Sequence, residues 1–241
     1  MYNNPPLKTP LKTLKTLTTL KTLKTIQSPK ALEPPKILKT LLLLLFLMKN
    51  IIIFGAPGSG KGTYSDEIVA KYNMGHISTG DVLREQIKAG TELGKTAQGY
   101  IDNGQLLPDE LMIDILADAY DKFPAGKGVI FDGFPRTIPQ AEALKKMLAE
   151  RGHDMGMMIE LVVEEDVLMA RLLNRAKEQG RADDNEETIK KRFAVYHSQT
   201  APLSDWFAKE GMRNTFAWAE LGSKEGMLEA IFKTIDEAIK A

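Results

Sequence analysis

The chain has 241 residues, of which 43% are hydrophobic and 27% charged, a composition typical of a globular protein. It has no cysteine, which excludes disulfides, thiolate metal sites and cysteine nucleophiles. The formal net charge of zero hides an uneven distribution, because residues 1–48 carry eight lysines against one acidic residue and leave the remainder acidic. An acidic globular part is a poor binder of duplex DNA, so we expect no nucleic-acid partner.

Residues 1–47 have low complexity, with Leu-Lys-Thr repeated at a period of three over Leu7–Ile26. A period of three drifts around an α-helix and forms no apolar stripe. The apolar run Leu41–Met48 is too short to span a bilayer, and no small-residue cleavage site of a secretory signal follows it. We therefore expect a non-functional extension before a true start at Met48, with targeting as the alternative, and a cytoplasmic protein without a membrane partner.

From Lys49 onward, short apolar runs alternate with longer amphipathic stretches. Continuous apolar runs indicate strands that are covered on both faces, as in a parallel sheet. The expected strands are Ile51–Phe54, Gly75–Ser78, Val129–Phe131, Met157–Val163 and Asn214–Trp218. The expected helices are Gly62–Tyr72, Asp109–Lys122, Ile138–Arg151, Asp166–Lys177, Glu186–Lys209 and Lys224–Lys240. This order predicts an α/β fold with a doubly wound, five-stranded parallel sheet and ligands at the carboxyl ends of its strands.

Two stretches interrupt the alternation. Residues 78–107 form a long, mostly helical insertion after the second strand, and residues 176–185 form a short polar break between two helices. Insertions at strand ends lie beside the expected ligand site. We therefore expect both segments to close over substrates.

The strongest local motif is the sequence GAPGSGKGT at Gly55–Thr63, between an apolar strand and a helix, which is the setting of a P-loop. Its glycines let backbone N–H groups converge on one anion, and the helix start adds unpaired donors and a positive dipole end. The motif departs from the common P-loop pattern, because Gly62 follows Lys61 and the hydroxyl comes one residue later, at Thr63. The residues expected to bind a nucleoside triphosphate are Gly58, Ser59, Gly60, Lys61, Gly62 and Thr63.

A second motif, Val129–Thr137, indicates a buried strand that ends in Asp132 and continues into a rigid Gly-Phe-Pro turn. Asp132 follows the strand at the position where a carboxylate can hold Mg²⁺ or its waters. The turn is expected to aim Arg136 over the carboxyl edge of the sheet. The alternative is that Asp132 only caps the turn and that Arg136 is solvated.

The other arginines are expected to have no protein partner: Arg84, Arg171, Arg175, Arg181 and Arg192. For Arg84 the alternative is an ordinary surface arginine. Arg84 would lie in the first turn of a helix capped by Asp81, where the helix dipole disfavours a cation. Arg171 and Arg175 are four residues apart on one helix, which is a repulsive spacing. A bound anion would offset both costs.

Two further arginines belong to this region. Arg181 lies in the polar break, and Arg192 lies on the buried side of the helix that follows it. The acidic residues Asp183–Glu187 between them have two open interpretations, as helix caps or as functional groups. Together with Lys61, Arg84, Arg136, Arg171 and Arg175, these two arginines provide more cations than one triphosphate needs. The surplus indicates a second phosphorylated substrate.

With these motifs the chain resembles the adenylate kinase family across essentially all of residues 48–241. The matching segments are Gly55–Thr63, Ser78–Arg84, Phe131–Thr137 with Gln140, and Gly180–Glu187. The resemblance implies reversible transfer of the γ-phosphoryl group of MgATP to AMP, giving two ADP, by a monomeric enzyme with Mg²⁺ as its cofactor. It also implies that residues 78–107 bind the monophosphate and that residues 176–185 are a short lid. Longer lids of the family often hold zinc through cysteines, which this chain lacks.

The resemblance also implies roles for individual residues. ATP would be held by the P-loop residues named above and Arg175, with Mg²⁺ on Asp132 through water. AMP would be held by Thr79, Arg84, Gln105, Leu106, Leu107, Gly133, Phe134, Pro135, Arg136, Gln140, Arg181 and Arg192. The transferred phosphoryl group would be surrounded by the catalytic residues Lys61, Arg136, Arg171, Arg175, Arg181 and Arg192.

The nearest rival is another nucleoside monophosphate kinase. UMP/CMP kinases typically carry Ala and Asn where this chain has Thr79 and Thr137, so AMP is the favoured acceptor. A regulatory P-loop switch and an inactive adaptor remain as other classes, but both leave the surplus arginines unexplained. The acceptor phosphate has a second pKa of about 6 and needs no general base, so we expect no catalytic role for His76, His153 or His197.

Overall fold

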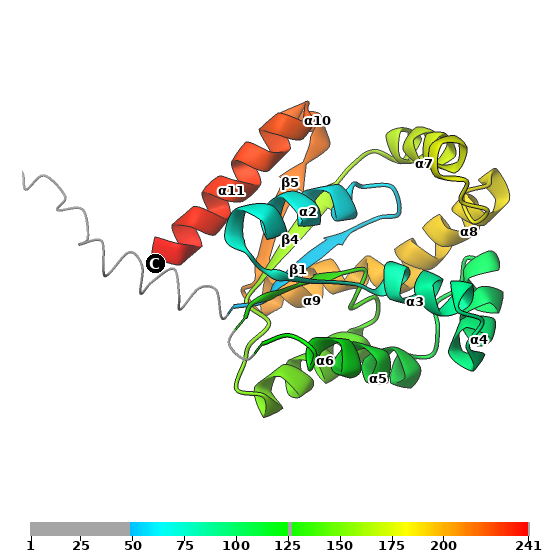
Figure 1. Cartoon of the computed structure of the whole chain (residues 1–241). Coiled ribbons are helices and arrows are strands. Elements are labelled where there is room, and N and C mark those ends of the chain that lie inside the picture. The colour runs from blue at the N-terminus through cyan, green and yellow to red at the C-terminus, as the bar shows by residue number, and fades with distance from the viewer. Residues whose placement is uncertain (1–48, 125–126, 241) are drawn as a thin grey trace, which may run out of the picture. The chain divides into compact units, whose positions relative to one another are not determined.

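The computed structural model describes residues 49–124 and 127–240 (Figure 1). The expectations for residues 1–47 and for Met48 lie outside this part of the chain. Among the helices of the described residues, none has the length and apolar character that crossing a membrane requires.

A five-stranded sheet forms the centre of the described fold. Its strands are β1 (Ile51–Gly55), β2 (Gly75–Ser78), β3 (Val129–Asp132), β4 (Met157–Val162) and β5 (Arg213–Ala217). They lie in the order β2-β3-β1-β4-β5, and each neighbouring pair is parallel. The predicted doubly wound parallel sheet is therefore confirmed, with strand ends that differ from the predicted ones by at most one residue. Because the chain winds to opposite sides of β1, the loops after β1 and β3 border one crevice.

Helices cover both faces of this sheet. They are α2 (Lys61–Tyr72), α3 (Thr79–Lys88), α4 (Glu92–Asp102), α5 (Asp109–Tyr120), α6 (Ile138–Glu150), α7 (Glu165–Gln179), α8 (Glu186–Val195), α9 (Pro202–Lys209), α10 (Trp218–Leu221) and α11 (Lys224–Lys240). Alternate residues of β1 face the two sides: Ile51 and Ile53 pack in an apolar cluster with α2 and α11, whereas Ile52 packs with α5, α6 and α9. Figure 1 shows these two layers around the strands.

The single helix predicted over Glu186–Lys209 is wrong. A π-helix, Tyr196–Thr200, separates α8 from α9, and the N–H of Ala201 donates to the carbonyl of Tyr196 at 2.8 Å, five residues back. Pro202 lacks an N–H and cannot continue the α-helical ladder, but it is tolerated as the first residue of α9.

The insertion after β2 contains α3 and α4, as the sequence suggested. The prediction that Asp81 caps this helix is wrong, because α3 begins at Thr79 and its N-cap is Ser78, whose hydroxyl accepts from the N–H of Asp81 at 3.3 Å. Asp81 instead lies in the first turn, where its charge suits the helix dipole. The polar break contains the end of α7, which closes at Gly180 with a positive φ of 64°, and the loop to α8.

Candidate active site

The P-loop connects the buried strand β1 to α2. Gly58 and Gly60 have φ values of 86° and 95°, a conformation that favours glycine. Gly60 is the N-cap of α2 and offers no side-chain cap, so the first N–H groups of the helix keep no side-chain partner from that position. This loop can therefore present several backbone donors and a helix dipole to one anion.

The ammonium group of Lys61 is held by the loop itself. Its Nζ donates to the carbonyl oxygens of Gly55 at 2.8 Å and Ala56 at 3.0 Å. Burial lowers the pKa of Lys61 to about 8, although the nearby Asp132 carboxylate acts in the opposite direction. Below that pH the group is a cation that is ready to exchange carbonyl oxygens for phosphate oxygens.

Asp132 ends β3, and its side chain is only 12% exposed. A β-carbon added to Gly62 would lie 3.7 Å from its Oδ2 atom, so this carboxylate faces the start of α2. His76 Nε2 lies 3.8 Å from the same oxygen, and the carboxylate raises the pKa of His76. The carboxyl edge of the sheet thus presents a largely enclosed carboxylate oxygen beside the P-loop.

The turn after β3 fixes Arg136 at the same edge. Gly133 has a φ of 77°, and its carbonyl accepts from Arg136 Nε at 2.8 Å and from Thr79 Oγ1 at 3.0 Å. The backbone N–H of Arg136 donates to Gln140 Oε1 at 2.7 Å. Burial lowers the pKa of Arg136 to about 10, with the Arg192 cation acting in the same direction. Among the described residues, no carboxylate forms an ion pair with this guanidinium group.

The prediction of no protein partner is wrong for Arg175 and Arg192. Arg175 donates to both carboxylate oxygens of Asp184, at 2.6 and 2.8 Å. Arg192 Nη1 donates to Asp184 Oδ1 at 2.8 Å and to Asp183 Oδ2 at 3.1 Å. Burial raises the pKa of Asp184, but the two arginines outweigh burial and lower it below its usual value. The N-cap of α8 is Asn185, so Asp184 is a partner of arginines and not a helix cap.

The remaining arginines differ in their contacts. Arg84 forms an ion pair with Asp81, one turn earlier on α3, so the prediction of no partner is wrong here too. The Arg171 guanidinium lies over the Trp218 ring, 4.2 Å from its centre, in a cation–π contact. Arg181 has no ion pair within the described ranges, and burial together with the charges of Arg175 and Arg84 lowers its pKa.

These side chains line a large cavity of about 1550 Å³. Its wall includes the P-loop, Asp132 and Trp218. All seven predicted cationic residues also line it: Lys61, Arg84, Arg136, Arg171, Arg175, Arg181 and Arg192. Five of the six predicted P-loop residues line it as well. The sixth, Ser59, is buried, and its hydroxyl has no hydrogen-bond partner among the described residues.

A second cavity, of about 660 Å³, lies over α3 and the turn after β3. Ten of the twelve predicted AMP residues line it: Thr79, Arg84, Gln105, Leu106, Leu107, Gly133, Phe134, Arg136, Gln140 and Arg192. The other two lie elsewhere, because Arg181 lines the large cavity and Pro135 lines a third one. The structure thus gathers residues from distant segments into two neighbouring cavities.

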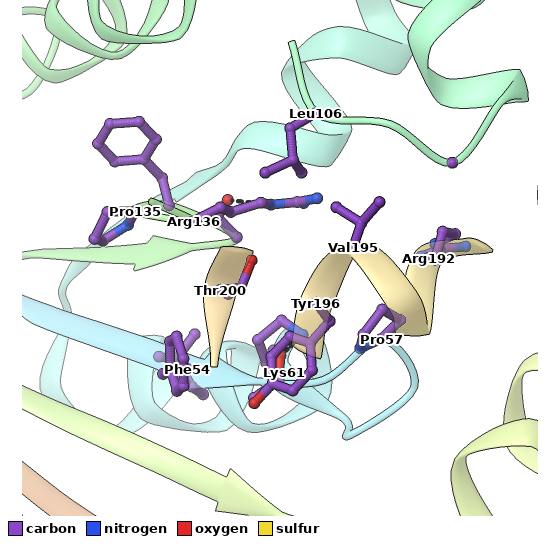
Figure 2. Close-up of a pocket in the computed structure, with 15 residues that line it drawn as sticks. Phe54, Pro57, Lys61, Leu106, Pro135, Arg136, Arg192, Val195, Tyr196 and Thr200 are labelled. Atoms are coloured by element: carbon purple, nitrogen blue, oxygen red, sulfur yellow. Dashed lines mark hydrogen bonds between the residues drawn. The ribbon is translucent and has the colours of Figure 1, made fainter. Parts of the chain in front are cut away.

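The third cavity, of about 560 Å³, shares Lys61 with the large cavity and Leu106 with the second one (Figure 2). In Figure 2 the Arg136 side chain extends between Leu106 on one side and Thr200 of the π-helix on the other. Arg136 and Arg192 line all three cavities. These two guanidinium groups therefore mark the place where the two larger cavities meet.

Sequence reasoning missed several residues of the site. Trp218 and Lys224 line the large cavity, and Tyr196 and Thr200 line the third one. Trp218 follows the last strand directly, so its position at the carboxyl edge could have been inferred from the strand order. The contribution of the π-helix could not, because its position depends on how α8 and α9 pack.

A P-loop, a carboxylate at the end of the neighbouring strand and a second arginine-lined cavity define this chain as a P-loop phosphotransferase of the nucleoside monophosphate kinase type. The sequence model of the adenylate kinase family matches residues 53–212. The chain belongs to the adenylate kinase family.

Curated relatives agree with this assignment. The chain is 65% identical to an adenylate kinase of Bacteroides thetaiotaomicron over 190 residues, which cover 79% of this chain and 100% of the relative. It is 64% identical to an adenylate kinase of Phocaeicola vulgatus over 193 residues, 80% of this chain and 99% of the relative. For an adenylate kinase of Parabacteroides distasonis the identity is 57% over 192 residues, 80% of this chain and 98% of the relative.

Proposed function

We propose that this phosphotransferase holds ATP in the large cavity and AMP in the second cavity, and that it transfers the γ-phosphoryl group directly between them. The reaction is reversible and gives two ADP. The observation that carries the residue assignments is that both cavities share three arginines, Arg84, Arg136 and Arg192, of which Arg136 and Arg192 also line the third cavity. Two nucleotides bound in this way meet end to end at a pair of guanidinium groups.

On the ATP side, the P-loop N–H groups and Lys61 bind the phosphates. The Arg175 fork reaches the same cavity while Asp184 holds its orientation. The guanidinium of Arg171 lies over Trp218 on the same wall, beside the first turn of α2. The space beside Gly62 is open, because a β-carbon there would have only the Asp132 carboxylate within 4 Å, at 3.7 Å.

The residues present fit Mg²⁺ bound through phosphates and water. Asp132 offers a carboxylate oxygen and Thr63 offers a hydroxyl at the same cavity, and Mg²⁺ commonly takes one or two carboxylates together with substrate phosphates. No group of three or more His, Asp or Glu side chains suited to a metal occurs in the described residues. When bound, Mg²⁺ supplies charge neutralisation at the β- and γ-phosphates.

The arginines supply alignment and electrostatic stabilisation rather than proton transfer. The acceptor oxygen of AMP is largely ionised at neutral pH, since the second pKa of a phosphate monoester is about 6. Catalysis then depends on holding the acceptor and the γ-phosphoryl group in line and on matching the charge of the transition state. Arg136 and Arg192 lie where the two phosphates meet, so they are assigned to the transferred group.

On the AMP side, Arg84 binds the phosphate, and the base lies against Thr79, Gln140 and the loop Gln105–Leu107. The segments 78–107 and 176–185 close over AMP and ATP respectively, which excludes water from the transfer. A monomeric state and a cytoplasmic location stay predictions, as does the absence of a nucleic-acid partner.

A coupled assay of ADP formation from ATP with AMP, CMP, UMP or GMP tests the proposal. AMP is expected to give the highest kcat/KM. A higher value with CMP or UMP would assign the chain to a different acceptor. Loss of ATP at the same rate without any monophosphate would contradict direct transfer.

A further inference from the structure

Asp109 is a charged residue beside the second cavity that has no assigned role. It is the first residue of α5, directly after the loop Gln105–Pro108. Its Oδ1 accepts from Gln140 Nε2 at 2.7 Å, and its Oδ2 accepts from Thr137 Oγ1 at 3.0 Å. No lysine or arginine of the described ranges forms an ion pair with it. Both carboxylate oxygens are therefore committed to the start of α6.

These contacts fix the orientation of the Gln140 side-chain amide. Gln140 is 1% exposed, and its Oε1 accepts from the backbone N–H of Arg136 at 2.7 Å. A carboxylate without a proton can only accept, and a backbone N–H can only donate. A rotation of the amide by half a turn would place an N–H against the Arg136 N–H and an oxygen against the Asp109 carboxylate. The Arg136 N–H and the Asp109 carboxylate each disfavour the flipped amide, and together they hold it in one of its two orientations.

The fixed amide has one donor and one acceptor left. Of its four hydrogen-bonding positions, one N–H serves Asp109 and one lone pair serves Arg136, which leaves one N–H and one lone pair. Gln140 lines the second cavity together with Thr79 and Leu107. A base in that cavity thus faces a donor and an acceptor in a fixed order.

The order of donor and acceptor separates two kinds of purine. A 6-amino purine presents an exocyclic N–H donor beside a ring-nitrogen acceptor, a pair that a glutamine amide matches with two hydrogen bonds. On the edge that carries N1, a 6-oxo purine presents the reverse, an exocyclic oxygen beside the N1–H. A freely rotating amide would adapt to both purines, whereas a fixed one leaves buried polar groups unpaired with the wrong purine.

We propose that Asp109 is a positioning residue that, together with the backbone N–H of Arg136, fixes the Gln140 amide for a 6-amino purine and so strengthens the preference of the acceptor site for AMP over IMP. This inference rests on the proposed function of the second cavity as the AMP site. Asp109 itself does not touch the substrate. It acts through Gln140.

The test compares kcat/KM for AMP and for IMP at saturating ATP in the full chain. In Asp109→Ala the AMP/IMP ratio is expected to fall at least about fivefold, through a higher KM for AMP, while the KM for ATP stays within twofold. Asp109→Ser, which lacks the second oxygen, is expected to act in the same direction and serves if the alanine variant does not fold. Asp109→Asn can still accept from Gln140 and is expected to keep the ratio within threefold of that of the unmodified chain.

The matched control is Glu110→Ala, which removes the neighbouring exposed acid from the same first turn of α5. It is expected to leave the AMP/IMP ratio unchanged. An unchanged ratio in a folded Asp109→Ala or Asp109→Ser variant would overturn the inference. Gln140→Ala distinguishes failure of the proposed AMP site from failure of the role of Asp109. If this variant leaves the KM for AMP unchanged, the proposed AMP site is wrong. If it raises the KM for AMP, the Asp109 variants test only the role of Asp109.

Discussion

Replacing Arg136 by alanine removes one of the two arginines that line all three cavities. Burial lowers its pKa to about 10, which still leaves the group charged at pH 7.5. An arginine that stabilises a transferred phosphoryl group contributes about 10³–10⁵ to the rate. We therefore expect kcat to fall by at least about 10³, which corresponds to about 4 kcal/mol of transition-state stabilisation.

The structure separates this loss from a loss of stability. The Arg136 side chain makes one hydrogen bond within the described protein, to the carbonyl of Gly133, and such a bond contributes about 1 kcal/mol to the free energy of unfolding. That cost leaves most of the chain folded, so it cannot account for a thousandfold decrease in kcat. The KM for ATP is expected to change less than threefold, because the P-loop and Lys61 remain.

The assay is a steady-state measurement of ADP formation with both substrates varied, together with urea unfolding of each variant. Arg151→Ala is the matched control. Arg151 follows α6 and forms a bidentate ion pair with Asp121, with both hydrogen bonds at 2.7 Å, and it lines none of the three cavities. Its kcat is expected to stay within twofold. A decrease of less than tenfold in Arg136→Ala would remove Arg136 from the transition state.

Three further outcomes are expected. Because burial lowers the pKa of Lys61 to about 8, the Lys61 cation is lost above that pH. The kcat/KM for ATP should therefore fall about tenfold from pH 7 to pH 9. A pH profile that is flat to pH 9.5 would refute this. Asp184→Asn leaves two arginines without their carboxylate and should lower the free energy of unfolding by about 3 kcal/mol in urea at pH 7, whereas a change below about 0.5 kcal/mol would show that the pairs contribute little. Because the pKa of Asp184 is lowered, this contribution is present at pH 7 and is lost as the pH falls through its folded pKa. Hydrogen exchange in residues 79–107 and 176–185 should slow when two linked nucleotides bind, and unchanged exchange in both would contradict closure.

The sheet was predictable because each strand is a short, continuous apolar run between turn residues. Ile51–Phe54 and Met157–Val163 lie in the structure almost as predicted, and their parallel pairing follows from the helices between them. The region after α8 was not predictable in the same way. The amphipathic pattern continues through Tyr196–Thr200, so only Pro202 indicated that the helix would be interrupted.

The site was predictable where its residues follow strands. Lys61, Asp132 and Arg136 lie directly after β1 and β3, and the strand order brings them to one edge. The partner of Arg175 was not predictable from helical spacing, because Arg175 and Asp184 are nine residues apart and pair across a loop. The contact of Asp109 with Gln140 spans 31 residues and depends on the packing of α5 against α6.

The central claim is that ATP and AMP bind end to end at Arg136 and Arg192. Inhibition by two adenosines joined through a chain of five phosphates tests it most directly, because one such molecule can fill both cavities. We expect it to compete with ATP and also with AMP, with one molecule bound per chain in calorimetry. Competition with only one of the two substrates, or two molecules bound per chain, would contradict the account.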